Sequence, residues 1–245
     1  MDIKVTNPSQ EDYPAKLKNT LKTEHPKIIY YTGNVNLLEK NSIAVVGSRD
    51  VDDKGVAFTK QLAECAVNLD YVIVSGAARG VDSEAQQRAL QCHGKVIVFL
   101  GTGISSYIKI KKHKDQITAG NLLVMSAVPC NMGYHVWNLL GRNKYLYGLS
   151  QGGFVVASDY GKGGTWSGAM ENLTNNWVKT YVWDNALKGN AKLIEHGAIP
   201  VRLDNLEQTL KAIDKIKAPQ KPLIMYDYSA IDPDSTLGIL IGLQK

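Results

Sequence analysis

Five short, almost continuous apolar runs between about residues 40 and 160 constrain the fold of this chain more than any other feature. Runs of this length without polar alternation are typical of strands that are buried on both faces, as in a parallel sheet. The five runs are Ser42–Val46, Tyr71–Val74, Val96–Leu100, Leu122–Met125 and Phe154–Ala157. Two shorter candidate strands follow at Tyr181–Trp183 and Ala198–Val201.

Segments with helical periodicity separate these runs. Apolar stripes that fit one face of a helix are formed by Phe58, Leu62, Ala66 and Leu69, by Trp166, Ala169, Met170, Leu173 and Trp177, and by Leu206, Leu210 and Ile213. A strand that is regularly followed by a helix returns to the sheet by a right-handed crossover. The pattern therefore predicts an α/β protein with three layers, α/β/α, around a mostly parallel sheet.

The repeating pattern also suggests the domain organisation. With 245 residues, the chain is long enough for one large α/β domain with a well-developed core. We expect this domain to span residues 41–217, with residues 1–40 as an extension packed on it. The segment K-A-P-Q-K-P after Ile216 is a linker signal, so residues 218–245 are expected to form a tail or arm.

Composition narrows the class of protein further. No run of 18 apolar residues predicts a membrane-spanning helix, and the polar N-terminus lacks the apolar stretch of a signal peptide. Three scattered cysteines are expected to be reduced thiols, which favours a cytoplasmic protein. The five histidines show no spacing typical of metal ligands, so neither a metal nor another cofactor is expected. A net charge of +5 does not by itself identify an anionic partner.

Glycine-rich loops follow four of the five predicted strands, and three of these loops carry a cation: Arg49, Arg79 or Lys162. In a parallel sheet such loops emerge together at the carboxyl ends of the strands, where open α/β folds bind ligands. Glycine lets backbone N–H groups approach a ligand, and the helices that follow direct their positive ends toward it. The loops therefore favour a site for phosphate or another oxyanion over purely structural turns.

The identity of the anion is less constrained. The loop after the first predicted strand reads G-S-R-D instead of G-x-G-x-x-G, and no segment matches the P-loop, so NAD binding and ATP hydrolysis are disfavoured. Asp82 is expected to be a helix N-cap, which is compatible with a role in orienting Arg79 or Arg49. The basic run Lys109–Lys114 fits a solvated face, or a stretch that tracks a nucleic-acid backbone. Trp137 is expected to be a core residue rather than a base-stacking platform.

Taken in order, the motifs resemble those of the DNA-processing protein A (DprA/Smf) family over roughly residues 13–200. The matching motifs are V-G-S-R at residues 46–49, S-G-A-A-R-G-V-D at 75–82, L-G-T-G at 100–103, R-N at 142–143 followed by G-L-S at 148–150, and G-N, L-I and G-A between 189 and 198. The combination is far more specific than any one motif.

The resemblance implies an extended Rossmann-like domain that holds single-stranded DNA in a positively charged pocket without being an enzyme. It also implies a homodimer that acts with a RecA-type recombinase in DNA uptake or processing. The candidate phosphate- or DNA-binding residues, from the loops and the resemblance together, are Gly47, Ser48, Arg49, Ser75, Gly76, Arg79, Gly80, Gly101, Arg142, Asn143, Lys162, Gly163, Gly164 and Thr165.

The chain departs from the family pattern in several places, so it looks like a divergent, minimal member. Gln86 stands where the family has histidine, Ala127 replaces an acidic residue, and Lys144 replaces the second arginine of R-N-R. Gly163-Gly164-Thr165 also resembles a motif of the lysine decarboxylase-like phosphoribohydrolases, but Gly168 stands where their catalytic glutamate would be, and Glu171 lies one turn farther. A nucleoside-monophosphate phosphoribohydrolase and a nucleotide-binding sensor are the alternatives.

Overall fold

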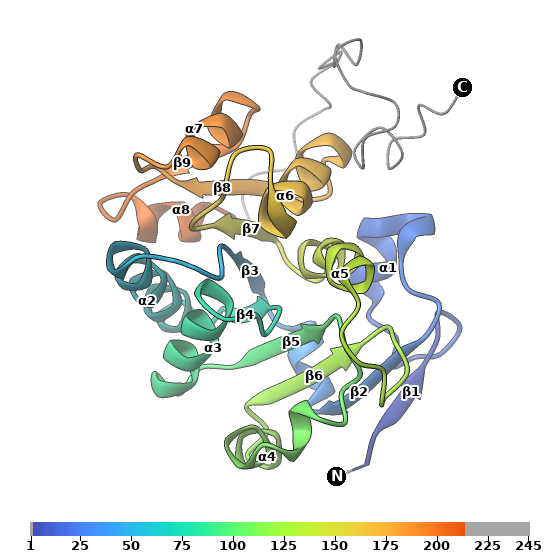
Figure 1. The fold of residues 1–245 in the computed structure, drawn as a ribbon. Coiled ribbons are helices and arrows are strands. Elements are labelled where there is room, and N and C mark those ends of the chain that lie inside the picture. Colours follow the sequence, from blue (N-terminus) through green and yellow to red (C-terminus); the bar gives the residue numbers. More distant parts are fainter. Residues whose placement is uncertain (1, 214–245) are drawn as a thin grey trace, which may run out of the picture.

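The computed structural model describes residues 2–213, which form one sheet covered by helices on both faces (Figure 1). In this part of the chain the sheet has nine strands in the order β1-β2-β6-β5-β4-β3-β7-β8-β9. The strands are β1 (Lys4–Thr6), β2 (Ile29–Gly33), β3 (Ser42–Val46), β4 (Val72–Ser75), β5 (Val96–Leu100), β6 (Leu122–Ser126), β7 (Gly152–Val155), β8 (Lys179–Trp183) and β9 (Ile199–Val201).

The seven strands from β6 to β9 in this order are parallel, which confirms the predicted mostly parallel α/β sheet. The register aligns Ile43 with Ile73, and Ile73 with Val96. Every residue of β3, β5 and β6 is buried, as expected for strands covered on both faces. The continuous apolar runs therefore arise because neither face of these strands meets water.

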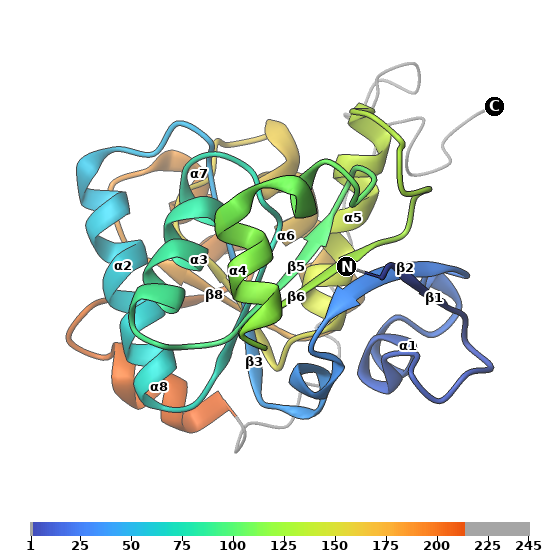
Figure 2. The same cartoon turned by 90° about the horizontal axis from the view of Figure 1, so that it is seen from below.

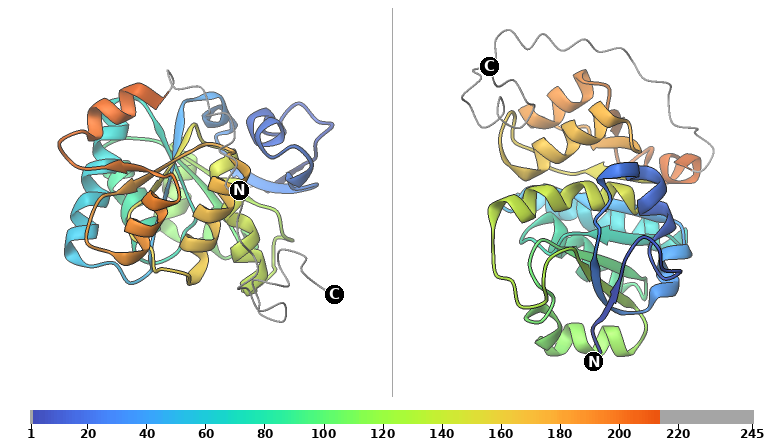
Figure 3. Two further views of the ribbon diagram at one scale, coloured as in Figure 1. Left: turned by 90° about the horizontal axis from the view of Figure 1, so that it is seen from above. Right: turned by 90° about the vertical axis from the view of Figure 1, so that its right-hand side faces the viewer.

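Helices cover both faces of the sheet (Figures 2 and 3), and within residues 2–213 four α-helices contribute to the core on each face. The core on one face receives residues from α2 (Asp53–Asn68), α3 (Val81–Gln91), α4 (Lys111–Thr118) and α8 (Leu206–Ala212). The core on the other face receives residues from α1 (Ala15–Leu21), α5 (Val136–Gly148), α6 (Gly163–Asn175) and α7 (Lys188–Glu195). Short 3-10 helices are η1 (Lys22–Glu24), η2 (Val35–Glu39) and η3 (Tyr107–Lys109). Figure 1 shows the three layers of the predicted α/β/α architecture.

The first 40 residues, expected as an extension packed on the domain, contribute two strands to the same sheet. β2 pairs antiparallel with β6, and Tyr31 lies opposite Met125. The hydroxyl groups of Thr6 and Tyr31 both donate to the carboxylate of Asp12, which ties β1 and β2 to the loop before α1. These two hydrogen bonds lower the pKa of Asp12. The predicted linker and tail, from residue 214 onward, lie outside the described residues.

Within residues 2–213, none of the helices has the length and apolar character needed to cross a bilayer.

Candidate anion-binding site

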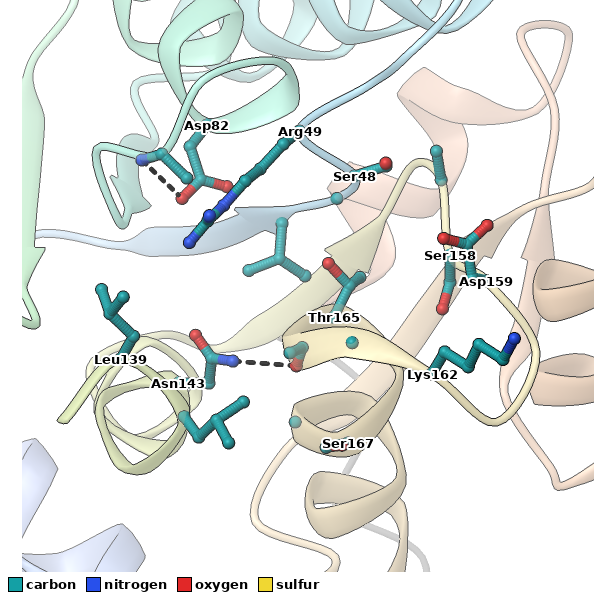
Figure 4. Close-up of a pocket in the computed structure, with 18 of the residues that line it drawn as sticks. Ser48, Arg49, Asp82, Leu139, Asn143, Ser158, Asp159, Lys162, Thr165 and Ser167 are labelled. Carbon is teal, nitrogen blue, oxygen red and sulfur yellow. Dashed lines mark hydrogen bonds between the residues drawn. The ribbon is translucent and has the colours of Figure 1, made fainter. Parts of the chain in front are cut away.

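A cleft of about 510 Å³ opens at the carboxyl ends of β3 and β7. Its walls are the loops that follow these two strands, the start of α6 and one side of α5 (Figure 4). Within the sheet, β3 lies between β4 and β7. The chain continues from β3 to the neighbour on one edge, β4, whereas the neighbour on the other edge, β7, comes much later in the sequence. The cleft therefore lies at the topological switch point, where open α/β sheets bind ligands. Its volume is in the range of small-ligand sites.

Most of the residues that the sequence singled out come together in the lining of this cleft. They are Gly47, Ser48, Arg49, Arg142, Asn143, Lys162, Gly163, Gly164 and Thr165. Arg49 and Lys162 are exposed side chains that lie on opposite sides of the cleft (Figure 4). The loops after β3 and β7 therefore supply cations to the same site, although they are more than 100 residues apart in the sequence.

Four of the remaining predicted residues lie behind the lining and shape it. Ser75 is fully buried, and its hydroxyl donates to the carbonyl oxygen of Val45 at 2.8 Å. Gly76 leaves room for the guanidinium of Arg142, which any Cβ at this position would displace. Gly80 packs against the backbone of Ser48 and Arg49, and Gly101 packs against Leu139 of α5. Their small size lets these loops approach one another closely.

Arg79, the cation of the second loop, also lies outside the lining. Its side chain is 75% exposed and forms an ion pair with the exposed carboxylate of Asp50. A surface pair of this kind contributes little to stability. The structure thus separates Arg79 from Arg49 and Lys162, with which the sequence grouped it.

Arg142 of α5 is the most buried cation of the cleft, with only 6% of its surface exposed. Its Nη1 atom lies 3.9 Å from Oδ2 of Asp82, too far for a hydrogen bond. Within residues 2–213, neither Nε nor Nη1 has a hydrogen-bond partner. Burial lowers the pKa of Arg142, and the nearby Asp82 opposes this shift, but a guanidinium stays charged in proteins. The cleft floor therefore holds a charged group with unused donors.

Asp82 is not the N-cap that the sequence predicted. Helix α3 begins at Val81 with Gly80 as its N-cap, so Asp82 lies in the first turn. The reason is the turn at Gly80, which starts the helix two residues earlier than the sequence suggested. Oδ2 of Asp82 accepts a hydrogen bond from the N–H of Ala78 at 3.3 Å and faces Arg142. Burial raises the pKa of Asp82, whereas Arg142 and the backbone donors oppose that rise.

The N-terminus of α6 forms the opposite wall of the cleft. Lys162 is its N-cap and makes no capping hydrogen bond with its side chain. Gly161 and Gly163 both have positive φ, at 69° and 77°, and this turn exposes the first N–H groups of the helix, which have no intrahelical partner. Nδ2 of Asn143 donates to the carbonyl oxygen of Gly164 at 2.8 Å, which fixes α6 against α5. Free N–H groups and the helix dipole favour an anion here.

Two residues of the floor were not predicted from the sequence. Tyr147 and Ser158 are 1% and 3% exposed and line the cleft, and their hydroxyl groups lack a hydrogen-bond partner among the described residues. Burial raises the pKa of Tyr147. The signal for Tyr147 is its position one helical turn after Asn143, on the same side of α5. Buried hydroxyls are normally satisfied, so these two keep hydrogen-bonding capacity for a ligand or an ordered water.

Charge alone does not decide what the cleft binds. Its lining contains three cations, Arg49, Arg142 and Lys162, and three carboxylates, Asp50, Asp82 and Asp159. Asp50 is engaged by Arg79 from outside the lining. What distinguishes the site is the combination of the buried charge of Arg142, two buried hydroxyl groups without a partner among the described residues, and the N–H groups at the start of α6. Together they fit a ligand that is rich in acceptor oxygens.

The fold and the cleft define a Rossmann-like α/β protein with a cleft at the switch point of its sheet. The model of the DNA recombination-mediator protein A family matches residues 4–214, so the chain belongs to this family, which confirms the resemblance to DprA and Smf proteins. The match covers all of the described strands and helices.

Individual relatives agree with the family match. The DNA processing protein DprA of Streptococcus pneumoniae is 31% identical over 177 residues, which cover 71% of this chain and 62% of that protein. Protein Smf of Escherichia coli is 33% identical over 150 residues, which cover 60% of this chain and 39% of that protein. The chain thus spans less than two thirds of the length of these relatives.

Solved structures share the fold. The structure of DprA from Streptococcus pneumoniae has a TM-score of 0.72 at 25% identity, covering 85% of this chain and 74% of that one. DprA from Helicobacter pylori, whose structure is described in terms of its single-stranded DNA binding mode, has a TM-score of 0.71 at 24% identity, covering 88% and 97%. Both confirm the predicted extended Rossmann-like fold.

Proposed function

We propose that this chain binds single-stranded DNA by holding the phosphate backbone in the cleft at the carboxyl ends of β3 and β7. The observation that carries this proposal is that Arg49, Lys162, the start of α6 and the buried guanidinium of Arg142 all meet in the lining of one cleft. The charge of Arg142 adds to those of Arg49 and Lys162, and cations and helix N-termini are the groups that bind phosphate oxygens in proteins. Support comes from the family membership and from the Helicobacter pylori relative that binds single-stranded DNA.

The residues of the cleft have complementary roles in this proposal. Arg49 and Lys162 are exposed at its mouth and attract the backbone by charge. The N–H groups of Gly163 and Gly164 donate to phosphate oxygens from the start of α6. Arg142 acts from the floor, with Asp82 as its partial counter-charge. No described residue of the cleft needs to react, so the proposed activity is binding that depends on salt and tolerates any sequence.

Fluorescence anisotropy with a labelled oligonucleotide at several salt concentrations tests the proposal. Three phosphate contacts predict a slope of log affinity against log salt of about −2, because each contact to a single strand contributes about −0.7. Replacing Arg49 or Lys162 by glutamine is expected to weaken binding and to reduce the slope by about 0.7. Lys27→Gln is the matched control, because Lys27 is an exposed cation that lies outside the lining.

The proposal fails if affinity does not respond to salt, or if Lys27→Gln weakens binding as much as Arg49→Gln. It also fails if the combined replacement of Arg49, Arg142 and Lys162 leaves affinity unchanged.

We further propose that the chain forms a homodimer and acts with a RecA-type recombinase in DNA uptake or processing, as its family membership suggests. Light scattering of the full chain measures the first property. The second is measured as the rate of recombinase filament assembly on single-stranded DNA with and without this protein. A monomeric mass, or an unchanged assembly rate, would count against the respective proposal.

A free nucleotide is the second candidate ligand, because a cleft of about 510 Å³ with two unpaired hydroxyl groups suits a small molecule. Comparing the affinities for a mononucleotide and for an oligonucleotide decides between the two, since a sensor binds the free nucleotide more tightly. For the phosphoribohydrolase alternative, Glu171 is not among the lining residues, and Gly168 packs against Asn143. Release of ribose 5-phosphate from a nucleoside monophosphate is the assay for that activity.

A further inference from the structure

An exposed group of aromatic side chains borders the cleft at the start of α5. Trp137 is 69% exposed, more than any other large hydrophobic residue among those described, and Tyr134 is 59% exposed. The sequence-based expectation that Trp137 belongs to the core is therefore wrong. Val136, in the same turn of α5, is also exposed, at 53%, and we call the residues Tyr134–Trp137 the aromatic rim.

The aromatic rim is continuous with the cleft. Tyr134 and Val136 belong to the cleft lining, and so do Leu139 and Leu140 in the next turn of α5. The imidazole of His135 stacks on the indole of Trp137, with ring centroids 4.8 Å apart and planes inclined by 26°. This contact orients the indole and leaves most of its surface open to solvent. A chain whose backbone occupies the cleft would meet this indole where it leaves the site.

The segment that leads to the rim is anchored by backbone hydrogen bonds. The N–H of Gly103 donates to the carbonyl oxygen of Met132 at 2.8 Å, and the N–H of Ser105 donates to that of Cys130 at 3.0 Å. Met132 in turn donates to the carbonyl oxygen of Pro129 at 2.8 Å. The rim is thus held in place before a ligand arrives, which reduces the entropy lost on binding.

The charge around the rim selects the kind of partner. No aspartate or glutamate occurs between Asp115 and Asp159, so the rim segment itself carries no negative charge. Exposed flat rings in a segment without acidic residues suit a partner that is anionic but presents apolar faces. Nucleobases of a single strand have this combination, because each base offers a π-face next to a charged phosphate.

We propose that the aromatic rim is a stacking platform for the bases of the strand whose phosphates lie in the cleft, with Trp137 as its main contact. This inference rests on the proposed function, because the cleft must first hold the strand. It assigns charge attraction and base stacking to separate residues: Arg49 and Lys162 attract the phosphate backbone, whereas Trp137 stacks on the bases.

The experiment compares two labelled strands of equal length, oligo-dT and an abasic oligonucleotide with the same number of phosphates. The full chain is expected to bind oligo-dT about 5- to 150-fold more tightly, which corresponds to about 1–3 kcal/mol for one stacked base. Trp137→Leu should remove most of this preference while leaving the affinity for the abasic strand and the salt slope unchanged. Trp137→Phe keeps an aromatic ring and should retain most of the preference. Tyr134→Leu is a second variant on the same rim, expected to lower the ratio less.

The possible results separate the rim from the cleft. If both strands bind well but Trp137→Leu keeps the full preference for oligo-dT, the stacking platform is wrong and the cleft proposal stands. If neither strand binds, the proposed function fails and the platform fails with it. If Trp137→Leu instead changes the mass measured by light scattering without changing the ratio, the rim is an interface between copies of this chain, which also overturns the inference.

Discussion

Gly80 lies where the loop after β4 touches the loop after β3, and it offers a sharp test of how the site is built. Its backbone, at φ 79° and ψ −131°, is in a region that residues other than glycine rarely occupy. A Cβ there would lie less than 3.0 Å from the carbonyl oxygens of Ser48 and Arg49. Both oxygens belong to the backbone, so no change of rotamer relieves the contact.

These two effects set the magnitude for Gly80→Ala. The backbone conformation costs about 1–3 kcal/mol, and forcing a methyl group into a filled space costs a similar 1–3 kcal/mol. We therefore expect the free energy of unfolding to fall by about 2–6 kcal/mol, a large part of the 5–15 kcal/mol typical of a domain. Urea denaturation measures this change. In the fraction that stays folded, displacement of the Arg49 loop should weaken binding of an oligonucleotide.

Gly141→Ala is the matched control, since it adds the same methyl group near the same site. Gly141 lies inside α5, and a Cβ there meets nothing within 4 Å. Alanine is favoured over glycine in a helix by about 1 kcal/mol, so this variant should be more stable by about that amount. The two variants thus have opposite signs. If the free energy of unfolding of Gly80→Ala lies within about 0.5 kcal/mol of that of the unmodified protein, the two loops are not in the close contact that the structure shows.

Three further predictions concern stability and its dependence on pH. Asp52 caps α2 by accepting a hydrogen bond from the N–H of Gly55 at 2.8 Å, so Asp52→Ala should lower the unfolding free energy by about 1 kcal/mol in urea titrations, and Asp53→Ala, which removes no cap, should lower it less. Burial lowers the pKa of His113 below its usual 6.5, so the protein should lose stability as pH falls from about 6.5. His113→Gln should flatten that dependence between pH 7.5 and 5.5, and an unchanged profile would exclude His113 as its cause. The hydrogen bonds from Thr6 and Tyr31 lower the pKa of Asp12, so the ionised carboxylate should stabilise the fold above pH 3.8 and this stabilisation should be lost below it. In Asp12→Asn, unfolding in acid, followed by circular dichroism, should therefore depend less steeply on pH.

The class of fold was predictable because burial on both faces leaves a direct trace in the sequence. Runs such as Val96–Leu100 have no polar position, and only a covered parallel sheet explains several of them in succession. The place of β2 in the sheet was not predictable in this way. Its antiparallel pairing depends on β6 presenting a free edge almost 100 residues later, which no local pattern records.

The cleft was predictable as a region, but the direction of each side chain was not. The sequence placed Arg49, Arg79 and Lys162 at one edge of the sheet, and the edge is indeed where the cleft opens. Whether a cation points into the cleft depends on the turn that carries it. The turn at Gly80 sends Arg79 to the surface, while Gly76 makes room for Arg142 from a distant helix. The assignment of these residues to DNA binding stays a prediction.

The pairing of β2 with β6 has a consequence for how the chain folds during its synthesis. Tyr30 of β2 pairs with Ser126, so at the roughly 5–20 residues per second of translation, β2 waits about 5–20 s for its partner. During that time β2 can pair only with the short strand β1, so Ile29 and Tyr31, both buried in the final fold, are not yet covered by the rest of the sheet. Such transiently exposed apolar strand residues are prone to aggregation and are substrates for chaperones. Because β3 pairs with both β4 and β7, the sheet grows outward from its centre, and the N-terminal strands join it only after β6 has been made.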